Sequence, residues 1–129
     1  MNKILIEISI GELLDKISIL EIKRDKIKDP DKLSFISDEL SKLKDELEKN
    51  VKHDAKLDDL HQSLKIINLR LWDIEDKKRQ CEKEKVFTEK FIKLSRDVHI
   101  LNDDRAKIKL EINNHTGSII KEIKQYTNY

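Results

Sequence analysis

The chain has 129 residues, 41% of them charged and 37% hydrophobic, with only two Gly and one Pro. So few turn-forming residues exclude a sandwich or barrel of many short strands, and the composition is instead typical of long helices in one domain, residues 1–129. Positive and negative side chains are interleaved and nearly cancel, with a net charge of +1, so we expect no nucleic-acid partner.

The first segment alternates apolar residues. From Ile4 to Ile10 every second residue is isoleucine, which predicts a short extended segment. Ser9 and Glu12 have the spacing of a capping box, so a first helix is predicted from about Ile10 to Lys28. Arg24 occupies one slot of its apolar seam, which otherwise consists of Leu13, Ile17, Leu20 and Ile27.

The second helix is predicted to start at Pro30, with Asp29 as its cap, and to end near Asn50. Its apolar residues repeat at alternating spacings of three and four, as in a coiled coil: Leu33, Ile36, Leu40, Leu43 and Leu47.

The third helix is predicted from His53–Asp54 to about Lys83. Ile66, Leu69 and Trp72 give it a second apolar edge, so we expect it to be the central helix and to touch more than one neighbour. Its main seam keeps heptad spacing: Leu57, Leu60, Leu64, Ile67, Leu71 and Ile74.

A fourth helix is predicted to begin at Phe87–Thr88, with Thr88 as its cap and Phe87 stapled to Ile92. Arg105 again occupies a slot of its seam. The helix is expected to end at Asn113, Asn114 and Gly117, and the tail from Ser118 to Tyr126 to form a short helix or a strand. The other seam residues are Phe91, Leu94, Val98, Leu101, Ile108 and Ile112.

Together these elements predict an all-α fold: an elongated bundle of about four long amphipathic helices with coiled-coil-like seams and a short extended N-terminal segment. The third helix has more apolar surface than three others can cover, which predicts a homodimer with two-fold symmetry. No apolar run approaches the roughly 18 residues of a membrane span, and no signal peptide is recognisable. We therefore expect no membrane partner and a cytoplasmic location, with which the single Cys81 agrees.

The arginines in the seams are the strongest site candidates. A buried arginine must pair, reach water or bind an anion. Arg105 and Lys109 are like charges one helical turn apart and need a negative group nearby, either a carboxylate such as Asp73 or Glu75 or a ligand. Structural ion pairs and an anion site both remain open. The candidate anion-binding residues are Arg105, Lys109, Asn102, Arg79, Arg96 and Arg24.

Other chemistry has weaker support. Glu75 and Arg79 are spaced to pair on a solvated helix face. Asp58 and His61 have one spacing used in metal-binding bundles, but the other ligands that such a site needs are missing. Two glycines cannot build a phosphate loop or a nucleophile elbow, and Cys81 is expected to pack in a seam. We expect no metal and no cofactor, and we assign no catalytic residue.

Four stretches of the chain form a set that can be compared with known families. They are Glu12–Lys23; Leu71–Asp76 with Arg79 and Glu82; Phe91–Leu94 with Arg96, Val98, Asn102, Asp103, Arg105, Ala106 and Lys109; and Ser118 with Glu122, Lys124 and Tyr126. Together they resemble domain of unknown function family 6165, a family of small helical proteins from bacteria and phages. The resemblance covers most of the chain, although Ser95 and His99 stand where Ala and Tyr are more usual. It implies a link with surface-polysaccharide biosynthesis and provides no established catalytic residues to carry over.

Two functions follow. The first is a structural module that binds protein partners through its heptad faces. The alternative is a binding protein or enzyme for a small anionic ligand, such as a sugar nucleotide or phosphosugar. Whether the chain is an enzyme is left open.

Overall fold

The computed structural model of the chain describes residues 2–120 and 122–129. These residues form four α-helices and no strand, and 76% of them are helical, which confirms the all-α prediction. Within the same residues, no helix combines the length and the apolar character that crossing a membrane would require.

The first two helices, α1 (Ile10–Lys26) and α2 (Pro30–Asn50), form a hairpin. Ser9 caps α1 as predicted, because its Oγ accepts a hydrogen bond from the Glu12 backbone N–H at 3.0 Å. The first helix ends two residues before the expected Lys28. Ile27 is already extended there, and Asp29 precedes a proline and caps α2 through the Asp31 N–H.

A longer hairpin follows, made of α3 (Ala55–Glu84) and α4 (Glu89–Thr116). Asp54 caps α3 by accepting a hydrogen bond from the Leu57 N–H at 2.8 Å. Both helices end at a residue in the left-handed region: Lys85 at φ 58° after α3, and Gly117 at φ 70° after α4. Glycine suits this backbone, so the predicted stop at Gly117 is confirmed.

The start of α4 departs from the prediction. Thr88 is the N-cap residue, but its side chain makes no capping hydrogen bond. Phe87 packs edge-on against Phe91, with ring centroids 5.3 Å apart, whereas the predicted partner Ile92 is exposed.

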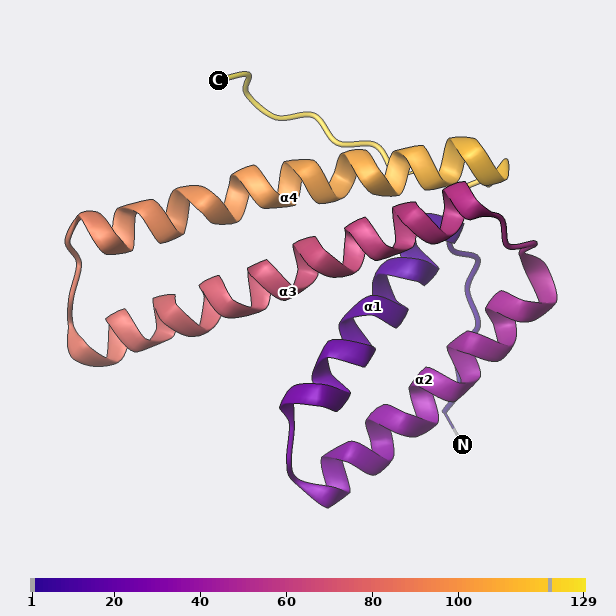
Figure 1. The fold of residues 1–129 in the computed structure, drawn as a ribbon, viewed down its shortest axis with the longest axis horizontal. Helices are drawn as coiled ribbons and strands as arrows, with labels where there is room; N and C mark the ends of the chain where they lie inside the picture. The colour runs from indigo at the N-terminus through magenta and orange to yellow at the C-terminus, as the bar shows by residue number, and fades with distance from the viewer. Residues whose placement is uncertain (1, 121) are drawn as a thin grey trace.

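Figure 1 shows α1 between α2 on one side and the α3–α4 hairpin on the other. The two short helices cover the half of the long hairpin where α3 begins and α4 ends, and the other half projects beyond them, which gives the molecule its elongated shape. Because α1 contacts all three other helices, it is the central helix, and the prediction that gave this place to α3 is wrong.

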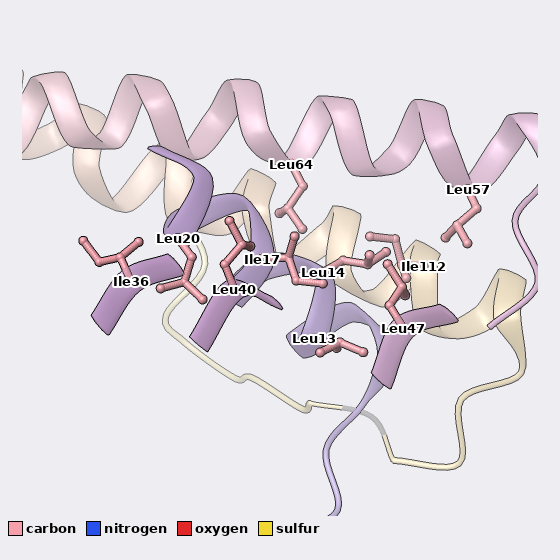
Figure 2. Packing of buried hydrophobic residues seen from close by; sticks show 10 residues of the cluster. All are labelled: Leu13, Leu14, Ile17, Leu20, Ile36, Leu40, Leu47, Leu57, Leu64 and Ile112. Atoms are coloured by element: carbon pink, nitrogen blue, oxygen red, sulfur yellow. The ribbon is translucent and has the colours of Figure 1, made fainter. Parts of the chain in front are cut away.

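The main core lies where α1 meets its three neighbours (Figure 2). Leu14, Ile17, Leu64 and Ile112 are almost completely buried there. The predicted seam of α3 is confirmed, since all six of its residues are buried or half-buried. A second, smaller core of Leu71, Ile74 and Leu101 continues along the long hairpin.

Two expectations agree with the structure and one is wrong. Ile66 and Leu69, in the second apolar edge of α3, remain exposed, in agreement with the prediction that the other three helices cannot cover all of its apolar surface. Residues 2–8 form no helix or strand, in agreement with the short extended N-terminal segment. The described tail residues, 118–120 and 122–129, form neither the expected helix nor a strand.

Candidate functional site

A buried polar cluster joins α1, α3 and α4. Asp15 of α1 is at its centre and only 2% exposed. One carboxylate oxygen accepts a hydrogen bond from the Asn68 amide at 2.8 Å, and the other lies 3.4 Å from the Arg105 guanidinium. Arg105 also donates to the Asn68 carbonyl at 3.4 Å, which closes a triangle between the three helices. The triangle satisfies a buried carboxylate that would otherwise be very costly.

Lys109 lies one turn further along α4 and is 5% exposed. Three carboxylates surround its ammonium group: Glu12 at 2.6 Å, Glu122 at 3.0 Å and Asp15 at 3.6 Å. Burial alone would lower the pKa of Lys109, but the hydrogen bonds to Glu12 and Glu122 outweigh it and raise this pKa above its ordinary value. The same contact with Lys109 lowers the pKa of Glu122. The lysine is therefore firmly charged and held by its own chain.

The start of α1 is fixed against the end of α4. The Gly11 N–H donates to the Asn113 side-chain carbonyl at 2.7 Å, and the Ile10 N–H donates to the Ser118 hydroxyl at 3.2 Å. A Cβ atom on Gly11 would lie 2.6 Å from the backbone oxygen of Lys109, so glycine permits this close approach. The approach brings Glu12 and Asp15 within reach of Lys109.

A surface pocket of about 410 Å³ lies beside the cluster, between α1, α3 and α4. Asn68 and Arg105 belong to both, so the cluster forms one wall of the pocket. The apolar part of the lining is Ile19, Ile22, Leu71 and Trp72. The remaining polar residues are Glu75, Asp76 and Arg79, which α3 presents on the same face as Asn68 and Trp72 because they repeat at helical spacing.

The charged residues of the cluster and those of the pocket differ in whether they are paired. Asp15 and Lys109 are paired within the chain, whereas Glu75, Asp76 and Arg79 make no hydrogen bond or ion pair with any described residue. The expected pair between Glu75 and Arg79 is thus not formed. Three charged side chains remain available to a ligand at the pocket.

The comparison with known families adds an identification. A model of a family of unknown function, DUF6165, matches residues 4–129. The chain belongs to this family. No curated protein and no solved structure matches it.

The stretches on which the resemblance to the DUF6165 family rests meet at the cluster and the pocket. The residues that they contribute to the two are Glu12, Asp15, Ile19, Ile22, Leu71, Trp72, Glu75, Asp76, Arg79, Arg105, Lys109 and Glu122. Segments that are far apart in the sequence thus form one region of the fold.

Of the six residues predicted to bind an anion, the fold brings together Arg79, Arg105 and Lys109. Asn102 is half-buried and Arg96 is exposed, and neither lines the pocket. Arg24 is also exposed, so its predicted seam position is wrong. It lies 4.0 Å from Glu21 and 3.9 Å from Asp25, carboxylates of its own helix.

The partner expected for Arg105 was also wrong. Asp73 lies 3.9 Å from Lys26, and Glu75 lines the pocket without pairing with Arg105. Sequence reasoning missed Asp15 and Asn68, although both leave a signal. Asp15 directly follows the buried Leu13 and Leu14, and Asn68 follows Ile67 in the heptad seam of α3. A polar residue at such a position needs a partner from another helix.

No group of three or more metal-ligating side chains occurs in the described part of the chain. Asp58 contacts His53 at 3.2 Å instead of forming the considered pair with His61. Burial lowers the pKa of His61, whose Nε2 atom is buried without a hydrogen-bond partner. Cys81 is buried, as its seam position predicted.

Proposed function

We propose that the chain binds a small anionic ligand that carries hydroxyl groups, a phosphosugar or sugar nucleotide, in the pocket between α1, α3 and α4. The observation that carries the proposal is the state of the pocket's charges. Glu75, Asp76 and Arg79 line the pocket together with its apolar residues and have no partner among the described residues. A concave, largely apolar pocket with a few convergent polar groups is the usual form of a small-molecule site.

The chemistry of the lining supports this ligand class. Arg79 and Arg105 can donate paired hydrogen bonds to a phosphate, because Arg105 uses only some of its five N–H donors on Asp15 and Asn68. Glu75 and Asp76 can accept from sugar hydroxyls. The neighbouring indole of Trp72 offers a flat apolar surface on which a sugar ring can stack. A ligand with both an anionic group and hydroxyl donors uses all of these groups.

The contacts of Lys109 argue against a direct role for this lysine in the proposed anion site. Three carboxylates already surround this lysine, so it needs no ligand to balance its charge. Arg105 remains a candidate because its side chain is still 27% exposed and lines the pocket. The anion is therefore proposed to bind between Arg79 and Arg105, with Lys109 supporting the wall behind them.

The setting of this activity is part of the proposal. We place the protein in the cytoplasm, where the free thiol of Cys81 would stay reduced. A link with surface-polysaccharide biosynthesis is supported by the family resemblance and by the ligand class inferred above.

The test uses Trp72, the only tryptophan of the chain, as a reporter inside the pocket. Hexose phosphates and nucleoside diphosphate sugars are titrated while the intrinsic fluorescence is followed, and the same compounds are screened by thermal shift. We expect a saturable fluorescence change and a rise in Tm with concentration, because a ligand that binds only the folded state stabilises it.

Substitutions test whether the fluorescence and thermal-shift signals come from binding in the pocket. Arg79→Met should weaken binding roughly 10- to 100-fold, the value of a lost charge-assisted hydrogen bond. Arg79→Lys should restore part of the affinity, since it keeps the charge but not the paired donors. Arg70→Met is the matched control, an exposed arginine of α3 outside the pocket, and should bind like the original chain. Equal affinities of the Arg79→Met and control variants, or no response from either class of compound, would contradict the proposal.

A further inference from the structure

The two ends of the described chain carry its most exposed large apolar side chains. Ile4 and Leu5 of the N-terminal segment are 86% and 84% exposed, and Ile119 and Ile123 of the tail are 99% and 91% exposed. Isolated apolar residues on a surface are ordinary, but several within two short segments indicate contact with another surface.

The tail turns its polar side toward the bundle. Glu122 reaches Lys109 at 3.0 Å, and Lys124 lies 3.7 Å from Glu122. Ile123, between them, points to solvent. In an extended chain successive side chains face opposite sides, so this tail presents its apolar side outward. A tail that only packed on its own bundle would have the opposite pattern.

Both segments leave the bundle from one point. The hydrogen bond between the Ile10 N–H and the Ser118 hydroxyl joins the end of the N-terminal segment to the start of the tail. From this point the N-terminal segment runs toward α2, and the tail runs back along α4 (Figure 1). Among the described residues, no backbone hydrogen bond joins Ile4, Leu5 or Ile6 to another part of the chain. The described residues of the two segments thus share no backbone hydrogen bond within one chain.

We propose that a second copy of this chain covers these segments, with the N-terminal segment of each copy paired in extended conformation against the tail of the other. A two-fold arrangement uses both segments of both chains and gives their free backbone groups partners. The sequence predicted a dimer from the surface of the third helix, but this pairing places the interface at the two ends of the chain. It does not depend on a ligand in the pocket.

The apolar area available sets the size of the proposed interface. Burying one such side chain removes on the order of 100 Å² of apolar surface. Because successive side chains of an extended segment face opposite sides, four of the exposed side chains can lie on the shared face and would bury roughly 400 Å² per chain before the backbone is counted, the size of a small interface. They are Ile4, Ile6, Ile119 and Ile123.

Light scattering of the full chain at tens of micromolar tests the proposal. We expect twice the mass of the 15.3 kDa chain. Ile4→Glu and Ile123→Glu should each weaken the dimer by about tenfold or more, because a charge replaces an apolar contact. Their Tm at concentrations where all variants are monomeric should equal that of the unchanged protein, since both side chains are exposed in the single chain. Phe35→Glu is the matched control, an exposed apolar residue of α2, and should remain dimeric.

Disulfide cross-linking tests the pairing itself. Ile6→Cys and Ile123→Cys proteins are mixed and mildly oxidised; Cys81 is buried and should not react. We expect cross-linked pairs that contain one of each protein, in preference to pairs of either alone. A monomeric mass, a dimer that survives both glutamate substitutions, or cross-links only between like proteins would overturn the proposal. So would a monomer that binds lipid vesicles through the same isoleucines.

Discussion

Replacement of Lys109 by methionine measures how much the buried charge cluster contributes to the stability of the bundle. Methionine keeps the length and apolar character of the lysine stem and removes only the ammonium group. Without the ammonium group, Glu12, Asp15 and Glu122 lose the cation that they share. The cost depends on which of these carboxylates can then reach water.

The burial of the three carboxylates sets the magnitude. Removing one partner of a buried ion pair costs about 3–5 kcal/mol when the remaining charge has no other partner. Glu12 and Glu122 have side chains 34% and 41% exposed, so both can be hydrated. Asp15 stays buried but keeps Arg105 and Asn68. We therefore expect a loss of about 2–3 kcal/mol in the free energy of unfolding, or roughly 10 °C in Tm.

Urea unfolding followed by circular dichroism gives this free energy. The measurement is made at a concentration where the protein is monomeric, so that dimer dissociation does not contribute. Lys107→Met is the matched control, an exposed lysine of the same helix, and should change stability by no more than about 0.5 kcal/mol. If Lys109→Met were as stable as its control, the three carboxylates would not need the lysine, and the description of the cluster as a structural element would be wrong.

Further predictions concern the same junction. Gly11→Ala should destabilise by about 1–3 kcal/mol in urea unfolding, because the new Cβ would lie 2.6 Å from a backbone oxygen; alanine usually stabilises a helix, so a gain would contradict the packing. Leu64→Ala should cost about 3–5 kcal/mol in the same assay, since Leu64 is completely buried in the main core. The raised pKa of Lys109 gives stability that is complete below its ordinary pKa of 10.5 and lost as the pH rises through the higher folded-state value. The stability of the unchanged protein should therefore fall more steeply above pH 10.5 than that of Lys109→Met, and parallel curves would refute this.

Local signals predicted most of the fold. The four helices appear in the expected order, and the caps at Ser9, Asp29 and Asp54 mark their starts because a short polar side chain satisfies a free backbone N–H. What failed depends on tertiary contacts. The width of the apolar face suggested that α3 is central, yet α1 is, since eight of its residues are buried against three neighbours. An apolar face shows that a helix packs, not which helix covers it.

The candidate site was predictable only in part for the same reason. The like charges of Arg105 and Lys109 correctly required a negative group nearby. Their actual partner Asp15 lies some ninety residues away in the sequence, and only the approach of α1 to α4 at Gly11 brings it close. The predicted seam position of Arg24 was wrong because the end of a short helix offers its side chain a route to water, where an arginine needs no buried partner.

The arrangement of paired and unpaired charges links stability to the proposed function. A guanidinium in a pocket is useful to a ligand only if its position is fixed before the ligand arrives, because ordering it during binding would reduce the affinity. Asp15 and Asn68 fix Arg105 from behind, and Lys109 in turn balances Asp15. Arg79, in contrast, is exposed and has no partner among the described residues, so a bound anion would have to order it. Arg105 should therefore determine where the anion binds, and Arg79 should add affinity at that position.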